Sequence, residues 1–174
     1  MSAVTAGPRT DAAARVRLLV LDVDGVLTDG RLYYTARGEA LKVFHVRDGL
    51  GIKLLAAGGV TAAVISGRRS RMTRRRCREL GVRHLLQGVE DKLAAFHRLR
   101  GRLGVSSGEC ACVGDDLPDV PLMREVGLSF AVADAHPQAR SAARVITRLA
   151  GGQGAVREIC DYLLEARRLA AAVT

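Results

Sequence analysis

LLVLDVDGVLTDG occupies residues 18–30 and decides the fold. An apolar run ends in two aspartates, Asp22 and Asp24, which are separated by one valine and followed by glycine. A short apolar run that ends at a turn residue is typical of a buried strand. Because a buried carboxylate is costly unless another group compensates it, this pattern predicts a functional site at the carboxyl end of the strand.

The rest of the chain alternates strand and helix patterns. Strand patterns lie at 16–23, 60–66, 84–88 and 109–116 and in two brief runs around Pro137; helix patterns lie at 48–59, 70–81, 91–104, 119–127 and 154–172. The residues 31–46 alternate around ARGE, which predicts a hairpin. This alternation predicts an α/β fold with a Rossmann-like parallel sheet and helices on both faces.

Length and composition agree with one globular unit. The chain has 174 residues and is 48% apolar, so we expect a flexible N-terminal arm over 1–14 and a single domain over 15–174. No run is long enough for a transmembrane helix, and the N-terminus lacks the apolar stretch of a signal peptide. We therefore expect a cytoplasmic protein without membrane contact. The four cysteines lack zinc-site spacing and are expected to be packed thiols.

The charge raises the question of nucleic-acid binding. The formal net charge is +9, and RRSRMTRRRCR at 68–78 is strongly basic. Aromatic residues make up only 3% of the chain and do not interleave with this cluster, so base stacking has little to work with. A solvated helix face that attracts anionic metabolites is the better interpretation. A basic nucleic-acid-binding or purely structural protein remains the alternative of a different class.

Polar residues close three of the predicted strands. These residues are Asp22 and Asp24, Ser66 and Gly67, and Asp115 and Asp116. Ligands of such sheets bind beyond the carboxyl ends of the strands, so neighbouring strands would bring these side chains together. Carboxylates without histidine or cysteine favour Mg²⁺. One carboxylate can then form an aspartyl-phosphate while the next moves a proton, and Ser66 and Lys92 are candidates for stabilising the phosphoryl group.

Four motifs in this order carry a resemblance to a known family. They are DVDGVLTDG (22–30), VISGR (64–68), DKL (91–93) and GDDLPD (114–119), and they resemble the motifs of the haloacid dehalogenase superfamily in its phosphatase branch. With HVRDGLGIK (45–53) and AGGQGAVREICDYLL (150–164) they are similar to the capless family of 3-deoxy-D-manno-octulosonate 8-phosphate phosphatases. The resemblance runs from residue 16 to about residue 168, and it implies a place in lipopolysaccharide biosynthesis.

The resemblance implies a role for each matching residue. Asp22 would attack phosphorus, and Asp24 would protonate the leaving alcohol and then activate water. Mg²⁺ would be held by the carboxylates of Asp22 and Asp115 and by the backbone carbonyl of Asp24, with Asp116 nearby. The phosphoryl oxygens would be held by Ser66 and Lys92. The positions that match contacts to the sugar acid are His45, Arg47, Asp48, Gly49, Lys53, Gly67, Arg68 and Arg76.

Three positions depart from the pattern of the family. His45 stands where asparagine is familiar, Lys53 where arginine is, and Gln153 where the tail usually reads GGRG. Lysine lacks the bidentate fork of arginine, and glutamine lacks its charge. These changes leave the expected chemistry intact but open the choice of substrate. A nonulosonate 9-phosphate of a sialic-acid-like pathway is the alternative to 3-deoxy-D-manno-octulosonate 8-phosphate.

Structural roles compete with the functional ones. A DxD pair by itself more often caps a turn. In this sequence it predicts catalysis, because SGR and GDD end two further strands. The second acid, Asp24, argues against dehalogenase activity. Arg68, Arg76 and His45 have solvated or structural alternatives. His84, His97 and His136 are taken as structural, and Asp29 and Asp119 as supports of the site or caps of turns.

The short insert has a consequence for assembly. Only the hairpin stands where a cap domain would lie, so the site is expected to be open to water and to large substrates. The resemblance implies a tetramer. We expect a homotetramer in which the hairpin and the tail from Gly151 onward cover the site of a neighbouring subunit. The alternative is an edge hairpin without a partner.

Overall fold

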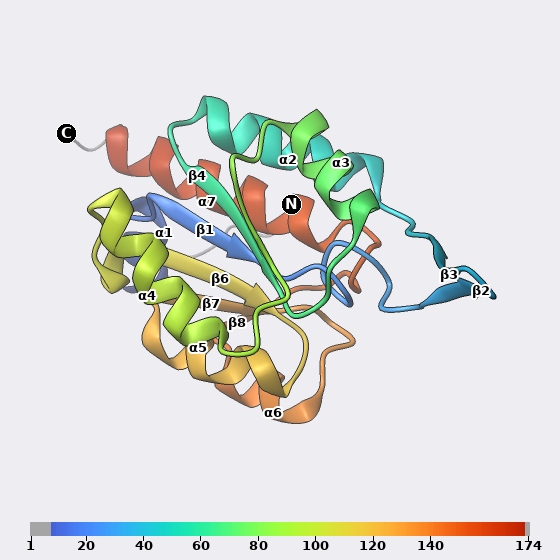
Figure 1. The fold of residues 1–174 in the computed structure, drawn as a ribbon. Helices are drawn as coiled ribbons and strands as arrows, with labels where there is room; N and C mark the ends of the chain where they lie inside the picture. Colours follow the sequence, from blue (N-terminus) through green and yellow to red (C-terminus); the bar gives the residue numbers. More distant parts are fainter. Residues whose placement is uncertain (1–7, 173–174) are drawn as a thin grey trace.

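The computed structural model describes residues 8–172, with side chains from Asp11 on (Figure 1). Its centre is a six-stranded parallel sheet in the order β5-β4-β1-β6-β7-β8. The strands are β1 (Leu18–Leu21), β4 (Thr61–Ser66), β5 (His84–Gln87), β6 (Cys110–Gly114), β7 (Leu128–Ala131) and β8 (Val145–Ile146). Each of these strands was expected from its apolar run, and the pairing of β1 with both β4 and β6 joins the three strands that end in polar residues.

Helices cover both faces of the sheet, as the alternating pattern predicts (Figure 1). One face carries α1 (Pro8–Ala14), α2 (Val46–Ala57), α3 (Arg71–Leu80) and α7 (Ala155–Ala171); the other carries α4 (Lys92–Leu103), α5 (Val120–Glu125) and α6 (Pro137–Ala142). The short 3₁₀ helices η1 (Ser107–Glu109) and η2 (Leu117–Asp119) flank β6. Because both faces are covered, β1 and β6 are buried at every position and read as continuous apolar runs.

The start of the described chain differs from the expected flexible arm. Residues 8–14 form α1, and the side chain of Ala13 is fully buried. Arg167 of α7 donates from Nη1 to the carbonyls of Ala14 and Val16, at 3.3 and 3.0 Å. Residues 8–14 thus form a helix where the sequence predicted an arm, because an Ala-rich turn docks on α7, and the flexibility of the arm stays a prediction. The rest of the predicted arm, residues 1–7, lies outside the described residues.

The tail belongs to the core of its own chain. Ile159, Cys160 and Leu163 of α7 are at most 1% exposed, and α7 packs against α2 and α1. The loop before α7 is fixed as well: a Cβ on Gly151 would lie 1.7 Å from the carbonyl oxygen of Gly25, so only glycine fits there. The apolar face of α7 is thus buried within its own chain, and the expectation that the tail covers the site of a neighbouring subunit stays a prediction.

The hairpin is the sole element inserted between β1 and α2 in the described chain. It consists of β2 (Tyr33–Thr35) and β3 (Gly38–Leu41), shorter than the expected span 31–46, and it projects from the body of the molecule (Figure 1).

All four cysteines are free and buried, as the absence of metal spacing predicts. None of the helices in the described part combines the length and apolar character that crossing a membrane requires.

Candidate active site

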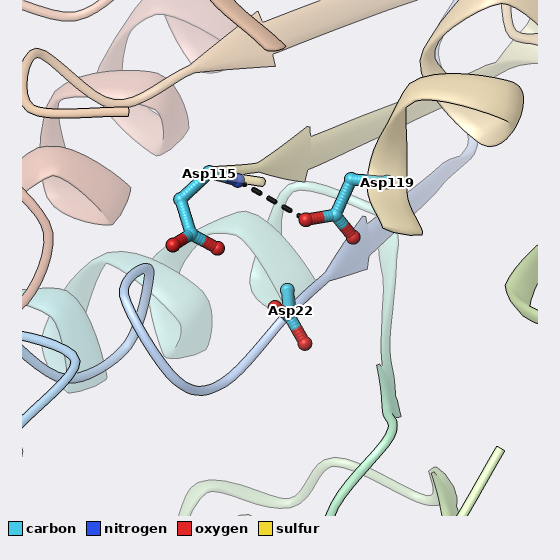
Figure 2. Close-up of side chains that lie close together, drawn as sticks. All are labelled: Asp22, Asp115 and Asp119. Atoms are coloured by element: carbon cyan, nitrogen blue, oxygen red, sulfur yellow. Dashed lines mark hydrogen bonds between the residues drawn. The ribbon is translucent and has the colours of Figure 1, made fainter. Parts of the chain in front are cut away.

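Three carboxylates meet at the carboxyl edge of the sheet (Figure 2). One carboxylate oxygen each from Asp22, Asp115 and Asp119 lies within 4.8 Å of the others. Asp22 follows β1, and Asp115 follows β6; the two strands pair with Leu21 opposite Val113, so Asp22 and, two residues after Val113, Asp115 reach the same edge. The predicted meeting of strand ends is therefore present for Asp22 and Asp115.

Asp119 completes the cluster from the first turn after β6. Its Oδ2 accepts hydrogen bonds from the backbone N–H of Asp115 at 3.1 Å and of Asp116 at 3.3 Å. A Cβ on Gly114 would lie 2.3 Å from the Cβ of Asp119, so glycine at the end of β6 makes this approach possible. Asp119 thus supports the site, one of the two roles considered for it.

Asp116 has a different place from the one expected for a metal ligand. Its side chain is exposed, and Oδ1 accepts from the backbone N–H of Leu117 at 2.8 Å, which caps η2. The acidic cluster contains Asp119 in its stead. Asp116 as a metal ligand therefore stays a prediction; in the structure its carboxylate caps the turn after β6.

Lys92 is the cation within the cluster. It is the first residue of α4 and 7% exposed, and its Nζ lies 3.0 Å from Oδ1 of Asp22 and 2.7 Å from Oδ1 of Asp119. Burial alone would lower the pKa of Lys92, but the two carboxylates raise it above its ordinary value. Lys92 therefore stays charged and fixes the orientation of Asp22.

One cation does not neutralise three acids. Burial, reinforced by the charge of Asp119 and opposed by Lys92, raises the pKa of Asp22 to about 6. Burial and the charges of Asp22 and Asp119 raise the pKa of Asp115 to about 8. Burial and the repulsion between the carboxylates thus both disfavour the ionised forms of Asp22 and Asp115. An all-oxygen donor set with surplus negative charge fits Mg²⁺, which binds through one or two carboxylates and keeps several waters.

Ser66 ends β4 beside this cluster. Its side chain is 2% exposed, and Oγ accepts from the backbone N–H of Arg68 at 3.3 Å. Gly67 between them is exposed and leaves its backbone accessible. Since β4 pairs directly with β1, the Ser66 hydroxyl and the Asp22 carboxylate share one edge of the sheet.

Asp24 contacts the hairpin and is not one of the three clustered carboxylates. Its Oδ1 pairs with Nζ of Lys42, and its Oδ2 lies 3.8 Å from Nε of Arg68. Arg68 also donates from Nη2 to the hydroxyl of Tyr34, at 2.6 Å. The structure thus brings the predicted residues Asp24 and Arg68 together, and it joins both to the hairpin.

The predicted sugar-acid contacts in the first turn of α2 have mixed placements. His45 caps this helix, because its Nδ1 accepts from the backbone N–H of Arg47 at 3.2 Å. Asp48 is 2% exposed and accepts from the backbone N–H of Arg157 at 2.8 Å, so it holds the start of α7. Burial raises the pKa of Asp48. Arg47 is exposed and lines a separate cavity of about 670 Å³ beside α7.

Two further predicted residues lie side by side. A Cβ on Gly49 would be 2.2 Å from Nη2 of Arg76, so the guanidinium of α3 lies directly over α2 at this glycine. Arg76 also pairs with Glu79 at 3.6 Å. Lys53 is exposed on α2. The remaining histidines have no place in the acidic cluster, and His136 caps α6 by accepting from Gln138.

Sequence reasoning missed the hairpin's share of the site. Lys42, Glu39 and Tyr34 contact Asp24 or Arg68, and none of them was singled out. The available signal was the charged pair Glu39 and Lys42, on and just after the second strand of a hairpin that follows the DxD strand. That signal identifies no partner by itself, because the partner is decided by how the hairpin folds back.

Comparisons with known proteins agree with this geometry. A family model for haloacid dehalogenase-like hydrolases matches residues 84–159. The 3-deoxy-D-manno-octulosonate 8-phosphate phosphatase KdsC of Escherichia coli K12 is 51% identical over 155 residues, which cover 89% of this chain and 82% of that protein. The corresponding protein of Yersinia pestis is 50% identical over 155 residues, with 89% and 83% covered.

Solved structures give the same result. The crystal structure of the Yersinia pestis phosphatase superposes with a TM-score of 0.90 at 48% identity and covers 92% of this chain and 86% of that one. The structure of 3-deoxy-D-manno-octulosonate 8-phosphate phosphatase from Moraxella catarrhalis, in complex with magnesium ion, phosphate ion and KDO, has a TM-score of 0.90 at 41% identity and covers 94% of both chains. The chain therefore belongs to the 3-deoxy-D-manno-octulosonate 8-phosphate phosphatases, a family of haloacid dehalogenase-like hydrolases.

Proposed function

We propose that this phosphatase hydrolyses 3-deoxy-D-manno-octulosonate 8-phosphate through an aspartyl-phosphate on Asp22, within a single domain over residues 15–174. The observation that carries the mechanism is the contact between Asp22 and Lys92 inside a cluster of three carboxylates. A carboxylate that is held in one orientation beside a buried cation is placed to act as a nucleophile. Asp24, two residues on, is the acid and base.

The proposed reaction has two steps. An oxygen of Asp22 attacks phosphorus while the bond from phosphorus to the sugar oxygen breaks, and Asp24 gives its proton to that oxygen. Asp24 then takes a proton from water, the water oxygen attacks phosphorus, and phosphate leaves as the Asp22 carboxylate re-forms. Lys92 and the Ser66 hydroxyl are the proposed partners of the phosphoryl oxygens, whose charge spreads in the transition state.

The carboxylates of Asp22 and Asp115 and the backbone carbonyl of Asp24 are the proposed ligands of Mg²⁺. The chemistry that the ion supplies when bound is neutralisation of the charge on the carboxylates and the phosphoryl group. The relative from Moraxella catarrhalis, whose structure holds a magnesium ion and a phosphate ion, supports this assignment. Asp119 binds the backbone of Asp115 and would keep that ligand in place.

The proposed substrate rests on the relatives. Proteins about half identical to this chain over most of their length are 3-deoxy-D-manno-octulosonate 8-phosphate phosphatases, and one related structure contains KDO. Arg68 lies beside Asp24, and Arg76 lies over α2 at Gly49; both are the proposed partners of the carboxylate of a sugar acid. The departures at His45, Lys53 and Gln153 keep a nonulosonate 9-phosphate as the second candidate.

The experiment that tests the substrate compares the two sugar-acid phosphates under the same conditions. Phosphate release with Mg²⁺ should show the larger kcat/KM for 3-deoxy-D-manno-octulosonate 8-phosphate. A nonulosonate 9-phosphate and 4-nitrophenyl phosphate serve as competitors of the same reaction type. A larger kcat/KM for the nonulosonate 9-phosphate would overturn the substrate and leave the phosphatase mechanism standing.

Metal binding should stabilise the protein more strongly at higher pH. The raised pKa of Asp115, about 8, means that the metal-free fold gains stability from the protonated carboxyl. The contribution of Asp115 to stability is fully present below its pKa in the unfolded chain, about 3.9. It is lost as the pH rises through its higher pKa in the folded protein. Mg²⁺ needs the ionised carboxylates, so its affinity rises over the same interval. At 100 times Kd the gain is about 2.7 kcal/mol, or roughly 5–11 °C in Tm for a chain of this size.

Thermal unfolding at pH 5.5 and pH 8, with Mg²⁺ or with EDTA, measures this effect. Asp115→Asn should abolish the shift caused by Mg²⁺ at pH 8. Asp116→Asn is the matched control and should keep the shift, because Asp116 caps η2 outside the acidic cluster. If both variants lose the rise in Tm caused by Mg²⁺ equally, Asp116 is a metal ligand as well. If the rise in Tm does not depend on pH, Asp115 is not a metal ligand.

We propose a homotetramer in which the hairpin and the tail from Gly151 onward of one subunit shield the site of another. The support is an apolar surface on the hairpin and the adjoining face of α2. It consists of Leu32, Tyr34, Leu41, Val43, Val46, Leu50 and Leu54, all 41% exposed or more. An exposed apolar patch of this kind is typical of an interface, and a second copy would bury it. A reducing compartment such as the cytoplasm is the proposed location, in keeping with four free cysteines.

A further inference from the structure

The base of the hairpin places a buried lysine against Asp24. The side chain of Lys42 is 2% exposed, and its Nζ pairs with Oδ1 of Asp24 and lies 3.1 Å from Oε1 of Glu39. Lysine usually extends its ammonium into water. An ammonium that is buried instead must be compensated by the groups around it, and here these groups are two carboxylates.

A second cation approaches Asp24 from the other side. Nε of Arg68 lies 3.8 Å from Oδ2 of Asp24 and is buried without a hydrogen-bond partner. Nη2 of Arg68 lies 3.7 Å from the Glu39 oxygen that Lys42 also contacts. Lys42 therefore holds Oδ1 of Asp24, whereas Oδ2 makes no hydrogen bond to Nε of Arg68 and remains able to carry a proton, and Glu39 ties the two cations together.

Glu39 and Arg68 are themselves anchored. The hydroxyl of Ser70 gives Glu39 a further side-chain hydrogen bond, and the hydroxyl of Tyr34 accepts from Arg68 at 2.6 Å. Both strands of the hairpin thus contribute to the arrangement around Asp24. Each carboxylate of the DxD pair has its own lysine: Lys92 lies 3.0 Å from Asp22, and Lys42 pairs with Asp24.

We propose that Lys42 is a positioning residue that holds Asp24 in the orientation from which its proton reaches the leaving oxygen. This inference rests on the proposed role of Asp24 as acid and base, and it gives the hairpin a function within its own subunit. A carboxylate on a strand-end loop has more than one rotamer, and a buried ion pair selects one of them. Positioned proton transfer contributes about 10²–10⁴-fold, and a displaced acid loses that contribution.

The leaving group distinguishes positioning from a general structural defect. An alkyl phosphate such as a sugar phosphate leaves as a strongly basic alkoxide and needs the proton of Asp24, whereas 4-nitrophenolate leaves without one. The ratio kcat/KM reports the step that forms the aspartyl-phosphate, so the later activation of water does not enter it. Lys42→Met should lower kcat/KM for the sugar phosphate about 10²–10³-fold and for 4-nitrophenyl phosphate less than about 10-fold.

Arg37→Met, at the exposed turn of the same hairpin, is the matched control and should leave both values unchanged. Glu39→Gln weakens the link between the two cations while keeping the pair of Lys42 with Asp24. It should therefore also lower kcat/KM more for the sugar phosphate than for 4-nitrophenyl phosphate, but by a smaller factor than Lys42→Met. It also carries the test alone if circular dichroism shows that Lys42→Met is unfolded. Lys42→Arg keeps the charge and should recover part of the loss on the sugar phosphate.

Equal losses of kcat/KM on the two substrates in Lys42→Met would overturn the proposal. A rise in KM for both substrates with unchanged kcat would overturn it as well, because Lys42 would then be a phosphate ligand. The ratios are taken against the wild-type protein on any pair of an alkyl and an aryl phosphate. Failure to hydrolyse 3-deoxy-D-manno-octulosonate 8-phosphate would therefore contradict the proposed substrate and leave this test intact.

Discussion

Asp22→Asn is expected to lower kcat by about 10⁶-fold or more while the fold remains intact, because loss of a catalytic nucleophile has effects of that size in other hydrolases. The amide of asparagine has nearly the shape of the carboxylate but cannot form the acyl phosphate. Phosphate monoesters hydrolyse so slowly without an enzyme that no solvent route compensates for the loss. Phosphate release measured over hours, with purified protein and Mg²⁺, gives the value.

The same substitution should not destabilise the metal-free protein at pH 8. Burial and Asp119 raise the pKa of Asp22 to about 6, so the ionised carboxylate is disfavoured there and a neutral amide relieves the repulsion. Asp29→Asn is the control from the same loop, because Asp29 accepts from the backbone N–H of Arg31 at 3.0 Å and asparagine can do the same. Activity of Asp22→Asn within 100-fold of the wild type would refute the nucleophile.

Lys92→Met has the second large expected effect, and it acts on stability as well as on activity. Lys92 lies within 3.0 Å of Asp22 and Asp119, and removing one partner of a buried ion pair costs about 3–5 kcal/mol. The loss should be greatest at pH 8 and smaller at pH 5.5, since protonation relieves the uncompensated carboxylates. Loss of one preorganised electrostatic contact in the transition state should lower kcat about 10²–10³-fold.

Urea unfolding at the two pH values measures the stability part of this prediction. Lys53→Met is the control for stability, because an exposed side chain on α2 should change the free energy of unfolding by less than about 0.5 kcal/mol. If Lys92→Met unfolds at the same urea concentration as the wild type at pH 8, the ion pairs do not hold the cluster together. An unchanged kcat in Lys92→Met would contradict the proposed role of Lys92 in catalysis.

The architecture could be predicted from the sequence because each strand carries its own signal. The apolar runs that end at Asp22, Ser66 and Asp115 are buried on both faces, and that burial makes them readable without any alignment. The ordered motifs then predicted the family, which the comparisons confirm. The residues 8–14 gave no such signal, because a short Ala-rich turn becomes helical only through its contact with α7.

The site was less predictable where side chains, and not strand ends, decide the geometry. Asp116 and Asp119 are three residues apart, and the sequence does not tell which one caps η2 and which one binds Lys92. Asp48 likewise matched a family position but points at the start of α7. The contacts of Lys42 and Glu39 depend on how the hairpin folds back on Asp24, a long-range feature that no local pattern carries.

The formation of a phosphoryl bond on Asp22 is tested most directly by trapping it. Protein that turns over 3-deoxy-D-manno-octulosonate 8-phosphate with Mg²⁺ is quenched in acid and reduced with borohydride, which converts an aspartyl-phosphate into homoserine. Mass spectrometry of the peptide that contains residues 18–30 should then show homoserine at position 22 and unchanged aspartate at position 24. Homoserine at Asp24 or Asp115, or no reduced residue in a fully active sample, would contradict the account.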